Sequence, residues 1–240
     1  MARRKPSLPR LIAGATLVGM LGVLAIFLYL QFNEESQSKN VGFRPLAEGF
    51  YSHGLDVSHY QGEIDWDKLF NKSSVEISFV YCKATEGTQI LDERWRRNRK
   101  MLRERKVPVG AYHYFRPEID ATLQARFFLK HYASRQNDLP PVIDVEEEGE
   151  DAISLINDVK RWMDIVEKKT GKQPIIYTNF YMFQKIFEPH FRDYKFWIAN
   201  YSDRPERMID ERIIYWQYSD QGKVPGIKGE VDLNMSKIEF

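Results

Sequence analysis

Eight short apolar runs recur between residues 54 and 233 of this 240-residue chain, and helix-like segments separate most of them. Continuous apolar runs are typical of buried parallel strands, and their alternation with helices is typical of βα units. The pattern therefore predicts an α/β fold: a compact, TIM-like (β/α)-barrel with some helices short or missing. An open doubly wound sheet is the alternative, but no GxGxxG or phosphate loop supports it. The predicted strands are 54–57, 77–83, 108–115, 141–146, 174–178, 196–200, 213–218 and 230–233, and the clearest helices are 92–105, 121–133 and 152–170.

A second apolar feature lies at the N-terminus, where residues 11–32 contain no charged side chain. As a helix this segment would be about 33 Å long, enough to cross a hydrocarbon core of about 30 Å. Four basic residues precede it, so the N-terminus is expected to stay in the cytoplasm. A cleaved signal peptide is the alternative, but the apolar run is long and no small-x-small cleavage site follows it.

These features predict a single-pass membrane protein of four parts. Residues 1–10 form a cytoplasmic basic tail, 11–32 a transmembrane signal anchor in the lipid bilayer, and 33–50 a polar tether. Residues 51–240 form the catalytic barrel, which is expected to be periplasmic or extracellular. The sequence does not identify protein partners.

Charge and cysteine content exclude several classes of function. The net charge is +1, but the N-terminal basic cluster accounts for the excess, and the remainder carries no basic stripe. Nucleic acid is therefore not an expected partner. The single cysteine, Cys82, has no partner for an intramolecular disulfide, and no zinc-ligand pattern occurs. We predict neither a metal ion nor a cofactor.

Polar and aromatic side chains gather at the ends of the predicted strands, where barrels of this kind place their functional residues. Aromatic rings pack on the apolar faces of sugars, while carboxylates bind hydroxyls and perform acid–base chemistry. A ring of carboxylates and aromatics therefore indicates a carbohydrate site. The carboxylates are Asp56, Asp144, Glu146 and Asp232, and the accompanying candidates are Lys83, Glu86, Tyr112, Tyr114, Tyr177, Trp197, Tyr201, Trp216 and Gln217.

The strongest local signal is the pair Asp144 and Glu146 in the fourth predicted strand. Residues two apart on a strand point to the same face, about 6.6 Å apart along the chain. Like charges at that spacing raise one pKa, which keeps a carboxylic acid protonated near neutral pH. Spacing alone leaves three interpretations open: an active site, a divalent metal site, or a solvated acidic loop continuing into residues 147–151.

Short segments around these strand ends also occur in a recognisable order. They are GLDVSHYQG at 54–62, IDW at 64–66, FVYCKATEG at 79–87, VGAYHYF at 109–115, IDVE at 143–146, PIIYT at 174–178, WIANY at 197–201, WQYS at 216–219 and VDLN at 231–234. Together they resemble glycoside hydrolase family 25, the Chalaropsis-type lysozymes. The resemblance implies a flattened (β/α)-barrel that cleaves the β-1,4 bond between N-acetylmuramic acid and N-acetylglucosamine in peptidoglycan glycan strands, without a cofactor.

The resemblance also implies roles for the four carboxylates. Glu146 resembles the general acid, Asp144 is the second carboxylate of the DxE pair, and Asp56 and Asp232 complete an acidic cleft. Retention through the substrate's own N-acetyl group and a direct carboxylate nucleophile both remain open as mechanisms. Two other functions compete: an inactive peptidoglycan-binding module, and a hydrolase of another amino-sugar polymer such as a chitin-like chain.

Overall fold

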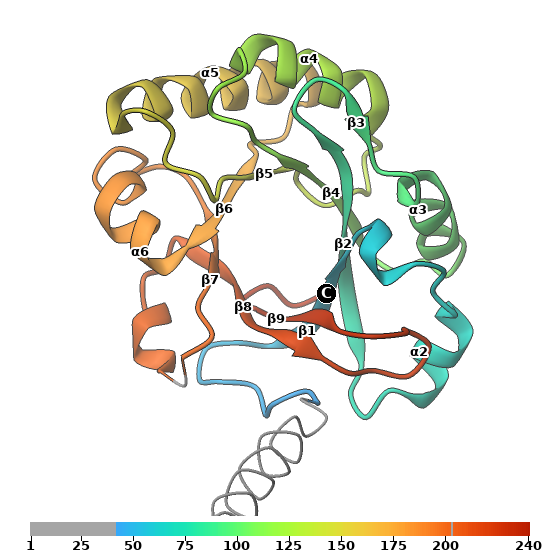
Figure 1. Ribbon diagram of the computed structural model, residues 1–240. Coiled ribbons are helices and arrows are strands. Elements are labelled where there is room, and N and C mark those ends of the chain that lie inside the picture. The colour runs from blue at the N-terminus through green and yellow to red at the C-terminus, as the bar shows by residue number, and fades with distance from the viewer. Residues whose placement is uncertain (1–41, 203) are drawn as a thin grey trace, which may run out of the picture. The chain divides into compact units, whose positions relative to one another are not determined.

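The computed structural model describes residues 42–202 and 204–240, and nine strands of this part form one sheet that closes into a barrel (Figure 1). The strand order is β1-β9-β8-β7-β6-β5-β4-β2-β3, and a further pairing of β1 with β2 closes the ring. β3 (Ile90–Leu91) is a two-residue addition at the edge of β2. The barrel strands are β1 (Ser52–Val57), β2 (Ile77–Glu86), β4 (Val109–Tyr114), β5 (Val142–Asp144), β6 (Ile175–Asn179), β7 (Phe196–Ala199), β8 (Ile213–Gly222) and β9 (Val231–Ser236).

The barrel is mixed. Neighbouring strands run parallel from β1 through β2 and β4 to β8, but β9 runs antiparallel to both β8 and β1. A parallel pair needs a crossover of a dozen or more residues, whereas residues 223–230 between β8 and β9 allow only a hairpin. The final strand therefore enters the sheet in the opposite direction.

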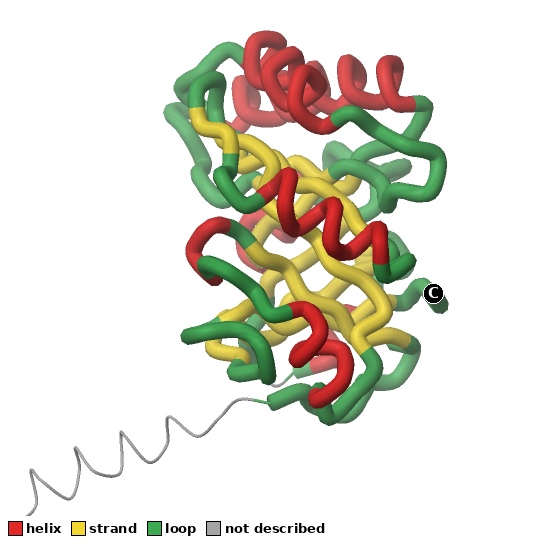
Figure 2. The backbone as a smooth tube through the Cα atoms, turned by 90° about the vertical axis from the view of Figure 1, so that its right-hand side faces the viewer, coloured by secondary structure: helices red, strands yellow, loops and turns green. Residues whose placement is uncertain are grey.

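Helices cover this barrel unevenly. Before β6 the connections carry α2 (Trp66–Lys72), α3 (Trp95–Glu104), α4 (Ala121–Tyr132) and α5 (Ala152–Thr170). After β6 the described residues of these connections carry only α6 (Phe180–Met182) with the π-helical turn Phe183–Phe187, and the 3₁₀ turn Pro205–Met208. Another 3₁₀ turn, His59–Gln61, follows β1. The two long helices α4 and α5 pack against each other on one side of the barrel (Figure 2).

The structure confirms the eight predicted strands and the three clearest helices, but the predicted fold class is wrong. The chain is not a TIM-like (β/α)-barrel of the α/β class, because its sheet is mixed and its helical layer is incomplete. The apolar runs identified buried strands correctly. Apolar runs carry no information about the direction in which each strand pairs, so they did not predict that β9 is antiparallel.

Large aromatic side chains fill the barrel below its open end. The rings of Phe79, Tyr81, Tyr177, Trp197 and Tyr215 are buried in one cluster. Tyr81 lies 5.0 Å from Trp197 and 5.5 Å from Tyr215 between ring centroids. We call this buried aromatic layer the aromatic floor; its close packing makes it a rigid base for the side chains at the open end of the barrel.

The predicted transmembrane segment, residues 11–32, lies outside the described residues, as do the basic tail and the tether up to residue 41. Within residues 42–202 and 204–240, no helix combines the length and the apolar character needed to cross a bilayer. The fold that the structure describes therefore contains no transmembrane helix.

Candidate active site

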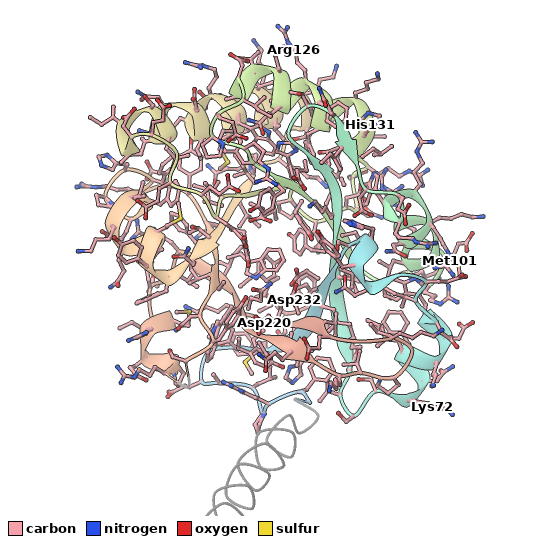
Figure 3. The ribbon with its side chains drawn as sticks, viewed as in Figure 1. Lys72, Met101, Arg126, His131, Asp220 and Asp232 are labelled. Atoms are coloured by element: carbon pink, nitrogen blue, oxygen red, sulfur yellow. The ribbon has the colours of Figure 1, made fainter. Side chains whose placement is uncertain are left out.

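A cavity opens where the parallel strands end, above the aromatic floor. Its volume, about 640 Å³ including the open mouth, is in the range of small-molecule sites. Figure 3 shows Asp232 within the barrel outline, whereas Lys72, Met101, Arg126 and His131 lie around the outside. The cavity is lined by Asp56, Ser58, Tyr60, Gln61, Lys83, Tyr112, Tyr114, Asp144, Glu146, Tyr177, Trp197, Gln217 and Asp232.

The structure brings together all four predicted carboxylates, which come from β1, the end of β5 and β9. Six other candidates line the same cavity: Lys83, Tyr112, Tyr114, Tyr177, Trp197 and Gln217. Residues far apart along the chain meet here because parallel strands place their carboxyl ends at one end of the barrel.

Three candidates do not line the cavity. The Glu86 carboxylate binds the Lys83 ammonium at 2.6 Å, and the Tyr201 hydroxyl donates to Gln217 Oε1 at 2.8 Å, so both support lining residues. Trp216 is buried, and its Nε1–H donates to the Asn200 carbonyl. Adjacent residues of a strand face opposite sides, so Gln217 points into the barrel and Trp216 points outward. Because Trp216 and Gln217 are neighbours on one strand, side-chain alternation alone could have shown that only one of them lines the cavity.

Three lining residues were missed as candidates: Ser58, Tyr60 and Gln61, in the turn after β1. Ser58 and Gln61 hydrogen-bond reciprocally and fix this turn. Tyr60 is 79% exposed, and its ring lies 4.1 Å from the His59 ring. The sequence feature that could have identified them is their position directly after Asp56 in the segment GLDVSHYQG.

Asp144 and Glu146 share a face but differ in surroundings. β5 ends at Asp144, and the buried Val145 between them donates its N–H to the Tyr177 carbonyl, which holds the segment extended. Asp144 is buried, and its Oδ1 receives no hydrogen bond from the described residues. Burial, followed by the charge of Glu146, raises the pKa of Asp144 well above its usual value, while Lys83 opposes this shift.

Glu146 is accessible from the cleft, although protein surrounds much of its carboxyl group. The resulting desolvation raises the pKa of Glu146, and a hydrogen bond from Tyr177 acts in the opposite direction. The Tyr177 hydroxyl also lies 2.8 Å from Gln217 Oε1, so its single proton is placed between two acceptors. An accessible carboxyl group with a raised pKa is suited to donating a proton.

A charge network holds Lys83 in the wall. Glu86 bridges Lys83 and Arg116, and Arg116 also pairs with Glu147. Burial by itself would raise the pKa of Glu86, but the hydrogen bonds from Lys83 and Arg116 outweigh burial and lower it. The Lys83 ammonium also lies 5.0 Å from the centre of the Tyr114 ring. The network keeps one cation beside the carboxylates of the cleft.

Asp56 and Asp232 form a second carboxyl pair on the opposite wall. Asp56 Oδ2 accepts from Asn234 Nδ2 at 2.7 Å and from Gln217 Nε2 at 3.1 Å. Burial raises the pKa of both carboxyl groups, and the charge of Asp56 raises that of Asp232 further, well above its usual value. Across the part of the chain that the structure describes, no group of three or more His, Cys, Asp or Glu residues is arranged to hold a metal ion.

Comparison with known proteins supports a common origin for this cavity. Residues 55–227 match the model of glycosyl hydrolases family 25. The chain is 38% identical over 204 residues to the uncharacterized protein YegX of Escherichia coli strain K12, covering 81% of this chain and 75% of that protein. It is 29% identical to Lysozyme M1 of Streptomyces globisporus, covering 75% and 66%.

Solved structures agree with the sequence comparison. A family 25 glycosyl hydrolase from Bacillus anthracis superimposes with a TM-score of 0.73 at 25% identity, covering 82% of this chain and 94% of that one. The family model spans the strands that supply most of the cavity, from β1 to β8. The chain therefore belongs to glycosyl hydrolases family 25 and is a glycoside hydrolase.

Proposed function

We propose that this glycoside hydrolase cleaves peptidoglycan at the β-1,4 bond between N-acetylmuramic acid and N-acetylglucosamine. The observation that carries the proposal is the Asp144–Glu146 pair, two carboxyl groups with raised pKa values in an aromatic-lined cavity of a family 25 chain. The substrate class is supported by relatives that are named as lysozymes, such as Lysozyme M1.

In the proposed reaction Glu146 is the general acid. Its proton passes to the glycosidic oxygen as the bond from that oxygen to the anomeric carbon breaks, and the sugar develops oxocarbenium character. Lys83 favours the ionised form of Asp144, and in that form Asp144 stabilises the positive charge beside the anomeric carbon, through the N-acetyl group or directly. Water then adds to the anomeric carbon, and the proton that it loses restores Glu146.

Aromatic side chains provide the sugar-binding walls in this proposal. Tyr112, Tyr114, Tyr177 and Trp197 present rings to the cavity, and the exposed Tyr60 extends this surface at the rim. Such rings pack against the C–H faces of pyranose sugars. Lys83 and Gln217 add polar contacts. A glycan strand bound across this opening would place one glycosidic bond beside Glu146.

Product analysis tests the proposal. The full-length protein, in detergent, is incubated with purified peptidoglycan, and the soluble fragments are identified by mass spectrometry. We expect fragments that end in reducing N-acetylmuramic acid. Reducing N-acetylglucosamine ends would contradict the bond assignment. Binding without cleavage would favour an inactive binding module, and activity on a chitin-like polymer alone would favour a different amino-sugar substrate.

We also propose that the N-terminal segment holds the enzyme at a membrane. The support is in the sequence: residues 11–32 are uncharged and follow a basic cluster. This orientation places the N-terminus in the cytoplasm and the catalytic body in the periplasm or outside the cell. We expect the full-length protein in the membrane fraction and a variant lacking residues 1–35 in the soluble fraction. A truncated variant that remained with the membranes would contradict the anchor. The orientation is tested by adding protease to spheroplasts: a catalytic body that is protected from the protease would contradict its location outside the cytoplasm.

A further inference from the structure

Two buried amide side chains both bind one oxygen of Asp56. Asn234 on β9 is fully buried and donates from Nδ2 to Asp56 Oδ2 at 2.7 Å, and Gln217 on β8 is 2% exposed and donates from Nε2 to the same oxygen at 3.1 Å. An oxygen that accepts two N–H bonds is favoured as part of an ionised carboxylate. The two bonds therefore favour the charged form of Asp56 and oppose the effect of burial, which by itself raises the pKa of this group further.

The orientation of Asn234 is dictated by a tryptophan. Asn234 Oδ1 lies 2.8 Å from Trp197 Nε1, and an indole N–H can only donate. The carbonyl end of the Asn234 amide must therefore face Trp197. This leaves the NH₂ end facing Asp56, so the hydrogen-bond network determines an assignment that the amide atoms by themselves leave ambiguous.

Gln217 presents its amide to Asp56 in the same sense, with two tyrosine hydroxyls at its carbonyl end. Its Oε1 accepts from the Tyr201 hydroxyl at 2.8 Å, and the Tyr177 hydroxyl lies at the same distance from this oxygen. The Gln217 NH₂ group is thereby directed at Asp56. Trp197 ensures that Asn234 presents a donor to Asp56, and the Tyr201 hydroxyl donates to the opposite end of the Gln217 amide.

The second carboxyl group of the pair, Asp232, lies directly opposite Asp56 in the antiparallel pairing of β1 with β9, where the two carboxyl groups can share one hydrogen bond. Two carboxylates cannot hydrogen-bond unless one of them carries a proton. The donors from Asn234 and Gln217 both converge on Asp56, and neither amide hydrogen-bonds to the Asp232 carboxylate. The proton therefore belongs on Asp232, which donates it to Asp56.

We propose that Asn234, oriented by Trp197, and Gln217, hydrogen-bonded to Tyr201, are positioning residues that keep the single proton of the carboxyl pair on Asp232. The wall opposite Glu146 then carries one fixed negative charge, on Asp56, rather than two. The link to glycan cleavage rests on the proposed function, whereas the position of the proton does not.

Other titratable groups surround the pair and enter its pH dependence. Asp220 on β8 and Glu146 after β5 raise the pKa of Asp232, and Lys83 on β2 acts on Asp144 and Glu146. The groups facing the pair are Asp144, Glu146, Asp220, Tyr112, Tyr177 and Tyr201.

Infrared spectroscopy of the full-length protein tests, without needing activity, whether the carboxyl pair holds a proton. We expect the difference spectrum between the wild type and Asp232→Asn at neutral pH to contain the C=O stretch of a protonated carboxyl group. A difference spectrum that contained only the bands of an ionised carboxylate would overturn the proposal. This outcome is independent of whether the protein cleaves peptidoglycan.

The pH dependence of kcat/KM tests the positioning role. Removing the donor in Asn234→Ala favours protonation of Asp56, so the acidic limb should move to higher pH by about one to two units. Trp197→Phe keeps an aromatic ring but frees the Asn234 amide to turn, and should move the limb in the same direction by less. Asn98→Ala, which removes an equally buried amide on α3, should leave it in place.

Circular dichroism and thermal unfolding show which variants are folded. If Asn234→Ala folds and its acidic limb does not move, the role of Asn234 is overturned. If Asn234→Ala does not fold, an unmoved acidic limb in folded Trp197→Phe overturns it instead. An inactive wild type would instead count against the proposed function, and the infrared result would still decide whether the carboxyl pair holds a proton.

Discussion

Replacing Glu146 with glutamine is expected to lower kcat on peptidoglycan by about 10²–10⁴-fold while leaving substrate binding nearly unchanged. The amide keeps the size and polarity of the side chain but has no acidic proton for the leaving oxygen. Release of reducing ends from purified peptidoglycan measures the change, and sedimentation with the same material measures binding.

Glu148→Gln is the matched control for this experiment. Glu148 belongs to the same acidic loop but is exposed and does not line the cavity, so its loss should change kcat less than twofold. If Glu146→Gln were as active as Glu148→Gln, Glu146 would not be the acid. Because the general acid must be protonated, activity should also fall as pH rises through the raised pKa of Glu146.

Gly110→Ala is expected to lower the free energy of unfolding strongly, because its new methyl group would overlap an aromatic ring. A Cβ built at Gly110 lies 2.0 Å from Cε1 and 2.3 Å from Cδ1 of Tyr81. Tyr81 cannot withdraw easily: Trp197 and Tyr215 pack against its ring, and its hydroxyl donates to the Pro140 carbonyl. Overpacking of this kind lowers the free energy of unfolding by about 1–3 kcal/mol, and more where the ring is held this firmly.

Urea denaturation of the two glycine variants measures this effect. Gly42→Ala makes the same chemical change at a position with no atom within 4 Å, and should change the free energy of unfolding by less than about 0.5 kcal/mol. Equal midpoints for Gly110→Ala and Gly42→Ala would show that the aromatic floor adapts, contrary to the rigid packing inferred from the buried rings.

Secondary structure was predictable where local signals agreed. The predicted helix 152–170 coincides with α5, because Asp151 caps its first turn and Gly171 ends it with a φ of 68°. β5 is shorter than predicted and ends at Asp144, so Glu146 lies in the following loop. The change in boundary does not move Glu146 to another face, since the hydrogen bond from Val145 to Tyr177 continues the extended conformation.

The sequence by itself determined the strands, the long helices and the family, because apolar runs, caps and ordered motifs are local properties of the chain. Only the tertiary structure decided the direction of β9, the outward face of Trp216 and the inclusion of Tyr60 in the cavity. The same holds for the amide donors of Asp56, since Gln217 and Asn234 lie 161 and 178 residues away along the chain. Hydrogen bonds of this range depend on the pairing of β9 with β1 and β8, which no local pattern encodes.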